Sequence, residues 1–312
     1  MEPRSRSKLI VGSAVTAAIV LAALSFMLRD PAEVPAVEAP SGDASVAPSI
    51  GIPGSRPTAK LPVRRWDVLN PDVTAQAVLI QSLDDQFSFL NYGTYRMWPV
   101  ASLTKLLTAV VALETFGESK RVPVSETAVA TEGEAGGLRS GEVYSSSDLV
   151  KIMLMASSND AAAAFEEYGG GKEEFVKLLN TKAVEIGMQQ TNFADASGLS
   201  PEDQSSANDL LTLTTYIIEK HPEIFSWTRA QSLLAQPTND ATSHIVNNIN
   251  PLSADSTFLG GKTGTTPAAR ENLIAVLSFE NRRIAVIILG STDRFKELTN
   301  LLSWVRKAYE LQ

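Results

Sequence analysis

Cysteine is absent from the 312 residues, and histidine occurs only twice, as His221 and His244. The absence of cysteine excludes disulfides, thiolate zinc sites, iron–sulfur clusters and a cysteine nucleophile. Two histidines cannot build a histidine-rich metal site, and a Ser-His-Asp triad would have to use one of them. Catalysis would therefore rest on other oxygen and nitrogen groups, and we expect neither a metal nor another cofactor.

Clusters of positive charge are also missing. The sequence contains 27 basic and 35 acidic residues, a net charge of −8, and no Lys/Arg-rich block occurs beyond the first few residues. Such a chain is not expected to bind nucleic acid. Its 44% hydrophobic and 20% charged residues are typical of a globular protein with a substantial core.

An apolar run without any charge covers residues 9–28, directly after Arg4, Arg6 and Lys8. About 20 residues is the length that a helix needs to cross a bilayer, and the preceding positive charges favour a cytoplasmic N-terminus. We therefore expect a cytoplasmic tail at 1–8 and a transmembrane signal anchor at 9–28. A cleaved signal peptide is the alternative, but residues 26–30 offer no small-residue cleavage site.

Residues 29–63 are rich in proline, alanine and serine. This composition cannot bury enough apolar surface to offset the entropy of ordering, so we expect a disordered linker. The linker would tether a folded domain at 64–312 outside the membrane.

The remaining sequence predicts strands at both ends and helices between them. Apolar runs around polar turns predict one hairpin over 76–90 and another over 273–289. Apolar steps of three and four predict helices over 102–116, 148–155, 161–168, 172–186, 209–220 and 297–311. This order indicates an α+β fold with an antiparallel sheet flanked by helices and an all-helical subdomain. His221 is expected at a helix end and His244 in a strand, neither with a catalytic role.

Ser102 and Lys105 lie three residues apart at the start of a predicted helix, so that their side chains share a face. A serine hydroxyl needs a base to become a nucleophile. A lysine can be that base where burial and nearby positive charge lower its pKa. The pair alone is weak evidence for an active site, because a serine and a lysine at this spacing are expected about once by chance in a chain of this length.

Two further polar segments could complete a site. Ser157 and Asn159 fall in the break between two predicted helices, where a hydroxyl can relay a proton and a carboxamide can bind a peptide. The other segment reads Lys262-Thr263-Gly264-Thr265. Its lysine and threonine can bind a carboxylate, and its glycine lets a substrate approach closely. Helix capping or a turn would explain either segment alone, and a P-loop is excluded by the glycine spacing and the strand that follows.

The three segments together resemble the serine-type D-Ala-D-Ala carboxypeptidases of the low-molecular-weight penicillin-binding protein family. The likeness runs from about Ala75 to Trp304 and includes Ser197-Gly198-Leu199 and Asn248-Ile249-Asn250. It implies a β-lactamase/transpeptidase-like fold and an acyl-enzyme mechanism on peptidoglycan stem peptides, with inhibition by β-lactams. Ser102 would attack the penultimate D-Ala carbonyl, with Lys105 as base and Ser157 as proton relay.

The resemblance also assigns the substrate contacts. Asn159 would hold a substrate amide, and Lys262 and Thr263 the terminal carboxylate beside Gly264. The amide of Thr265, with that of the nucleophile, would bind the oxyanion.

Two departures from the family pattern affect these expectations. Relatives often add a C-terminal β-domain and a membrane-binding helix, whereas this sequence stops after its last predicted helix, so the N-terminal segment is expected to anchor the enzyme. Some relatives also place an arginine after the penultimate strand. Arg294 lies near that position in an uncertain register, and we leave it out of the predicted site.

Two alternative functions remain open. A class A β-lactamase would need a Glu-x-x-Leu-Asn loop, but Val176 stands where the glutamate should precede Leu179-Asn180. The second alternative is a catalytically inactive relative that binds the cell wall. Such a protein would not need the three motifs, which are intact in this sequence. Carboxypeptidase, endopeptidase and transpeptidase action share the acyl-enzyme and cannot be separated by sequence.

Overall fold

The computed structural model describes residues 61–311, apart from positions 134 and 240. The predicted tail and anchor, and all of the predicted linker up to residue 60, lie outside the described residues. Within the described part, no helix combines the length and the apolar character needed to span a bilayer.

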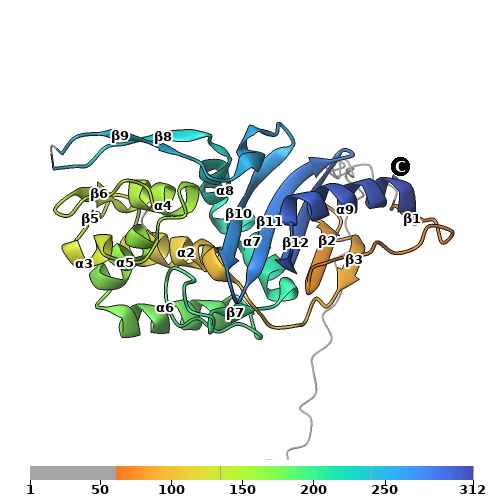
Figure 1. Ribbon diagram of the computed structural model, residues 1–312, viewed down its shortest axis with the longest axis horizontal. Helices are drawn as coiled ribbons and strands as arrows, with labels where there is room; N and C mark the ends of the chain where they lie inside the picture. Colours follow the sequence, from red (N-terminus) through yellow and green to blue (C-terminus); the bar gives the residue numbers. More distant parts are fainter. Residues whose placement is uncertain (1–60, 134, 240, 312) are drawn as a thin grey trace, which may run out of the picture. The chain divides into compact units, whose positions relative to one another are not determined.

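A five-stranded antiparallel sheet forms one half of the described fold, with the strand order β10-β11-β12-β2-β3 (Figure 1). Its strands are β2 (Ala77–Ser82), β3 (Ser88–Tyr92), β10 (Phe258–Thr266), β11 (Arg270–Phe279) and β12 (Arg282–Ser291). Both predicted hairpins are confirmed, and they join through the β2–β12 pair. β10 is an additional strand, and it carries the Lys262-Thr263-Gly264-Thr265 segment along the edge of the sheet.

Both faces of the sheet are buried, because alternate residues of its strands belong to different hydrophobic clusters. Leu79, Ile274 and Ile287 pack with the helices on one side, whereas their neighbours Ile80, Leu273 and Val286 pack on the other. Helix α9 (Arg294–Ala308) covers this second face. Helices α7 (Ala207–Lys220) and α8 (Pro222–Arg229) contact the first face (Figure 1).

The predicted all-helical part is confirmed as a bundle beside the sheet (Figure 1). It consists of α2 (Thr104–Phe116), α3 (Glu126–Val129), α4 (Ser146–Met155), α5 (Asn159–Tyr168) and α6 (Lys172–Glu185). Helix α2 is central, since every residue from Thr104 to Leu113 is buried, and it contacts α4, α5 and α6. It follows a 3-10 turn, η1 (Ala101–Leu103), so the helix predicted over 102–116 begins two residues later as an α-helix.

Several short elements were not predicted, apart from a strand at His244. They are the strand pairs β1 (Val63–Arg64) with β13 (Tyr309–Glu310), β4 (Trp98–Pro99) with β7 (Gln204–Ser205), β5 (Arg121–Pro123) with β6 (Val143–Ser145) and β8 (Ser232–Ala235) with β9 (His244–Asn247), and the 3-10 turn η2 (Pro251–Ala254). Helix α8 was also missed, because Pro222 follows the end of α7 and is the first residue of this next helix. His221 lies at the end of α7 and His244 opens β9, as expected.

Candidate active site

The candidate nucleophile Ser102 lies in the 3-10 turn η1, between the buried Ala101 and Leu103. Two glycines allow other segments to approach this turn. A Cβ on Gly264 would lie 2.8 Å from the carbonyl oxygen of Val100 and 3.1 Å from the amide nitrogen of Ser102, and a Cβ on Gly198 would lie 2.0 Å from the carbonyl oxygen of Ala101. Strand β10 and the loop around Gly198 therefore press against the nucleophile turn at distances that only glycine permits.

Lys105 points from the first turn of α2 toward Ser102, as the spacing predicts. Its Nζ lies 2.9 Å from Ser102 Oγ, 2.7 Å from Asn159 Oδ1 and 2.5 Å from the carbonyl oxygen of Ser197. The last two partners can only accept hydrogen bonds. In a neutral amine they would take both N–H groups, which leaves the nitrogen lone pair facing the serine hydroxyl.

The electrostatic surroundings favour that neutral form. Lys105 is completely buried. Burial lowers its pKa to about 7, although Asp195 and Asp203 act in the opposite direction. Near neutral pH the amine is therefore available as a proton acceptor for Ser102.

The break between α4 and α5 contains three polar residues, of which one serine caps a helix and the other two residues point toward the site. Ser158 caps α5 by accepting a hydrogen bond from the Ala161 amide at 3.1 Å. Ser157 has φ of 58°, a left-handed conformation that is uncommon outside glycine. Asn159 accepts from Lys105, while its Nδ2 donates to the carbonyl oxygen of Glu132 at 2.7 Å.

Lys262 reaches from β10 to the opposite wall of the site. Its Nζ donates to Ser157 Oγ at 2.9 Å and to the carbonyl oxygen of Thr263 at 2.8 Å. Burial, followed by the positive charges of Lys105 and Arg294, lowers the pKa of Lys262 well below its usual value. A bound carboxylate would restore the charged form of this amine.

An open cavity of about 240 Å³ lies between these elements. Its walls include Ser102 and Ser157 together with Thr263, Gly264 and Thr265. The remaining predicted residues touch this set, because Lys105 contacts Ser102, Asn159 contacts Lys105 and Lys262 contacts Ser157. The fold thus brings all eight predicted site residues together from three separate segments.

Arg294, which the sequence analysis left out, also lines this cavity. Its guanidinium donates to the carbonyl oxygens of Gly264 and Asn272, both at 2.8 Å, and to Thr265 Oγ1 at 2.5 Å. An ion pair with Glu271 at 3.3 Å fixes its other edge. The arginine therefore braces the end of β10 and adds positive charge to the cavity wall.

The loop that supplies the Ser197 carbonyl is held by one carboxylate. Asp195 Oδ1 accepts from the backbone amides of Ser197 and Gly198, at 2.8 and 2.6 Å, and from Ser197 Oγ at 2.8 Å. Its Oδ2 accepts from the Ser200 amide at 2.8 Å. These bonds lower the pKa of Asp195 despite its burial. Sequence reasoning included Ser197-Gly198-Leu199 only as a family likeness, because a backbone carbonyl leaves no residue-type signal.

Neither a metal centre nor the class A β-lactamase loop is present in the described part of the chain. No three His, Asp or Glu side chains there form a group that could hold a metal ion. Leu179 and Asn180 lie inside helix α6, as expected, and Asn180 Nδ2 donates to the carbonyl oxygens of Val176 and Phe193. The arrangement can instead activate a serine with a lysine and bind a carboxylate beside it.

Comparison with known proteins agrees with this geometry. The D-alanyl-D-alanine carboxypeptidase family matches residues 70–293. The D-alanyl-D-alanine carboxypeptidase DacF of Bacillus subtilis is 29% identical over 244 residues, which cover 75% of this chain and 62% of that protein. A D-alanyl-D-alanine endopeptidase of Escherichia coli is 28% identical, over 75% of this chain and 78% of that protein. The chain thus spans less than two thirds of the Bacillus relative.

Solved structures show the same architecture. A D-alanyl-D-alanine carboxypeptidase from Mycobacterium tuberculosis superimposes with a TM-score of 0.71 at 25% identity, covering 78% of this chain and 96% of that one. The Streptomyces K15 DD-transpeptidase superimposes with a TM-score of 0.69 at 20% identity, covering 77% and 100%, and supports the fold alone. The expected transpeptidase-like fold of helices and antiparallel sheet is therefore confirmed. With its family model matched over most of the folded region, this chain belongs to the D-alanyl-D-alanine carboxypeptidases, a family of serine peptidases.

Proposed function

We propose that this protein is a D-Ala-D-Ala carboxypeptidase that acts on peptidoglycan stem peptides through an acyl-enzyme on Ser102. The observation that carries the proposal is the contact between Lys105 Nζ and Ser102 Oγ at 2.9 Å. The amine is buried, has a pKa of about 7 and is held by two other acceptors. This is the geometry that a general base needs to activate a serine.

In the acylation step, Lys105 takes the Ser102 proton as Oγ attacks the penultimate D-Ala carbonyl. The amides of Ser102 and Thr265 would stabilise the oxyanion. Collapse of the tetrahedral intermediate breaks the peptide bond, and the departing amine takes a proton delivered from Lys105 through the Ser157 hydroxyl. Water then hydrolyses the ester and regenerates the serine.

Positive charge in the cavity supports the choice of a substrate with a free C-terminus. Arg294 of α9 places its guanidinium against the end of β10, Lys262 of β10 would regain its charge when a carboxylate binds, and Thr263 adds a hydroxyl. Lys262, Thr263 and Gly264 would hold the terminal carboxylate along the strand, while Asn159 binds an amide of the stem peptide. β-Lactams would acylate the same serine.

A fluorescent penicillin tests the nucleophile. We expect covalent labelling of the wild type and none of Ser102→Ala, with the labelled peptide identified by mass spectrometry. Ser303→Ala, which changes an exposed serine on α9, is the matched control and should label normally. Undiminished labelling of Ser102→Ala would refute the assignment.

Endopeptidase action is a second candidate, because relatives with that name from Escherichia coli and Pseudomonas aeruginosa match at 28% and 30% identity. Product analysis separates the candidates: a carboxypeptidase releases free D-Ala from a pentapeptide, whereas an endopeptidase cleaves a cross-linked peptide dimer. Rapid turnover of the penicillin, with no D-Ala released, would instead indicate the β-lactamase alternative. If the protein neither releases D-Ala nor is labelled by the penicillin, the result would indicate the catalytically inactive, cell-wall-binding relative.

We also propose the expected organisation of the chain: a cytoplasmic tail at 1–8, a transmembrane anchor at 9–28, a linker at 29–63 and a penicillin-binding peptidase domain at 64–312. The enzyme would then be a single-pass protein of the bacterial cell membrane with its catalytic domain outside. The uncharged 20-residue run and the preceding basic residues support this placement. The substrate, peptidoglycan, lies in that same compartment.

A further inference from the structure

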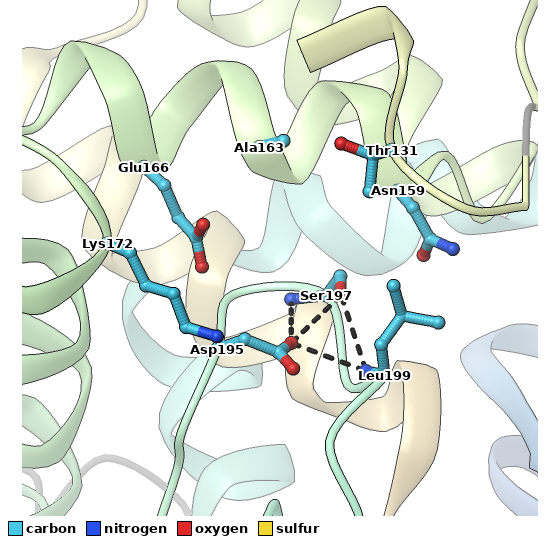
Figure 2. Close-up of a pocket in the computed structure, with 8 residues that line it drawn as sticks. All are labelled: Thr131, Asn159, Ala163, Glu166, Lys172, Asp195, Ser197 and Leu199. Carbon is cyan, nitrogen blue, oxygen red and sulfur yellow. Dashed lines mark hydrogen bonds between the residues drawn. The ribbon is translucent and has the colours of Figure 1, made fainter. Parts of the chain in front are cut away.

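Exposed apolar side chains are concentrated where the described domain begins. In the described part of the chain twelve large hydrophobic side chains are exposed, and four of these fall within nine residues. The four are Leu61, Val63, Trp66 and Leu69. Other exposed apolar residues belong to the active site, since Leu199 lines the cavity shown in Figure 2 and Ile249 lines the cavity beside Ser102. Trp66 and Leu69 are 86% and 84% exposed and line neither cavity.

The backbone that carries these side chains is attached to the domain. Arg64 donates a hydrogen bond to the carbonyl oxygen of Val68 at 2.6 Å, and its guanidinium lies 5.6 Å from the centre of the Trp66 ring. Trp304 of α9 donates to the carbonyl oxygen of Leu69 at 2.8 Å. Residues 61–69, which we call the junction segment, therefore hold an apolar surface toward solvent. Covering such a surface is favourable, and a cluster of this kind marks an interaction site.

The junction segment has little net charge. Its charged residues are Arg64, Arg65 and Asp67, and Arg65 forms an ion pair with Glu310 of β13 at 3.4 Å. Strong attraction to a surface of one sign is therefore not expected. Tryptophan, leucine and arginine side chains together suit the headgroup region of a bilayer, where an indole ring lies between water and the acyl chains.

The rest of the chain indicates that a bilayer is within reach of this surface. The uncharged run at 9–28, the proposed anchor, is joined to Leu61 by residues 29–60. A flexible linker of about 30 residues has a root-mean-square length of roughly 30 Å. A membrane that holds the anchor would therefore meet the junction segment at an effective concentration on the order of millimolar. At that concentration even a small apolar surface can stay bound.

We propose that the junction segment docks on the lipid bilayer, with the side chains of Trp66 and Leu69 inserted among the headgroups. Leu61 and Val63 extend the apolar contact toward the start of the domain. Docking holds the domain in one orientation on the membrane, which a linker alone does not do. This inference rests on the proposed membrane anchor.

Docking also limits the distance between the active site and the membrane. Helix α9 connects the two places, because Arg294, its first residue, lines the active-site cavity, and the carbonyl oxygen of Ala308, its last residue, accepts a hydrogen bond from Arg64 at 3.1 Å. A helix of 15 residues is about 22 Å long. The docked enzyme would therefore act on the peptidoglycan nearest the membrane.

Tryptophan fluorescence in lipid vesicles tests the docking. The chain has four tryptophans, none of them in residues 9–28, and Trp66 is the exposed one. Full-length protein is reconstituted in phosphatidylcholine vesicles with or without bromine atoms on the acyl chains, which quench tryptophans that contact the bilayer. We expect brominated lipid to lower the emission of the wild type, and Trp66→Phe to abolish this loss. High salt should not change the quenching, because the segment has little net charge.

Two matched variants show whether the apolar surface is responsible. Leu69→Asp keeps the tryptophan but places a charge in the docked surface, and it should abolish the quenching. Leu234→Asp makes the same change at an exposed leucine of β8 and should keep the quenching. None of these residues lines the active-site cavity, so penicillin should label every variant normally.

The outcomes separate the docking from the other proposals. Protein that floats with the vesicles but shows no quenching would overturn the docking and indicate another protein as the ligand of this surface. Undiminished quenching in Leu69→Asp would also refute it. Protein that does not float would overturn the anchor and the docking together, whereas a wild type that penicillin does not label would contradict the proposed function alone.

Discussion

At the scale of single residues, the amine of Lys105 combines complete burial with the absence of a directly bound anion. Its contacts are a hydroxyl and two carbonyl oxygens. A carboxylate in their place would hold the proton on the amine and prevent it from acting as a base. The nearest acidic influences act at longer range, from Asp195 and Asp203.

The pH dependence of acylation follows from this arrangement. Only the neutral amine accepts the Ser102 proton, so we expect the rate of labelling by a fluorescent penicillin to rise with pH through about 7, the pKa of Lys105. The charge of Asp195 raises that pKa. Asp195→Asn removes the charge, stabilises the neutral amine and should move the midpoint of the profile to lower pH.

A matched control separates the charge from a general loosening of the loop. Glu202→Gln removes an exposed carboxylate from the same loop, where water screens it, and should leave the midpoint in place. Loss of loop structure alone would lower the rate at every pH without moving the midpoint. An unchanged midpoint in Asp195→Asn would contradict the electrostatic role.

At the scale of elements, strand β10 and turn η1 must lie very close together for the site to form. Gly264 lies at this contact, and its Cα hydrogens face the backbone of Val100 and Ser102. A methyl group there would lie 2.8 Å from the Val100 carbonyl oxygen, so the strand or the turn would have to shift. A shift of this kind separates the nucleophile from Thr265 and Lys262.

We therefore expect Gly264→Ala to slow penicillin acylation by about a hundredfold, the usual cost of a displaced reacting group. Folding should be largely retained, since β10 keeps its pairing with β11, and a thermal melt would check this. Ser278→Ala, at an exposed position of β11, is the control and should acylate at the normal rate. If penicillin acylates Gly264→Ala at the normal rate, the close approach of β10 to η1 is not needed.

The elements also show where sequence reasoning succeeds. The Ser102–Lys105 pair depends on helical spacing alone, and the long helices and both hairpins depend on periodicity, so local patterns predicted them. Arg294 was missed because its contact with Gly264 joins positions 30 residues apart on different elements. Helix α8 was missed because the proline that ends one helix begins the next. These features depend on tertiary packing, which no local pattern records.

At the scale of the whole molecule, the proposed anchor predicts an intact N-terminus. Full-length protein isolated from the membrane fraction should retain residues 9–28, as mass spectrometry of its N-terminal peptide would show. Val20→Arg places a charge in the middle of the apolar run, which costs about 2.5–3.5 kcal/mol for insertion, and should reduce the membrane-bound share. A mature N-terminus beyond Leu28 would instead establish a cleaved signal peptide.

The short pair of β1 and β13 closes the described domain where the chain enters it. It involves only Val63 and Arg64 with Tyr309 and Glu310. A pull on a tether attached before Val63 would load this pair first, because no earlier described residue belongs to a sheet. The next attachment beyond this pair is Leu69, whose carbonyl oxygen accepts a hydrogen bond from Trp304 Nε1 of α9 at 2.8 Å. Peeling the chain back to that point would release about six residues and roughly 20 Å of length. The pair of β1 and β13 would then open before any element of the site, so that tension on the N-terminal segment is relieved without unfolding the site.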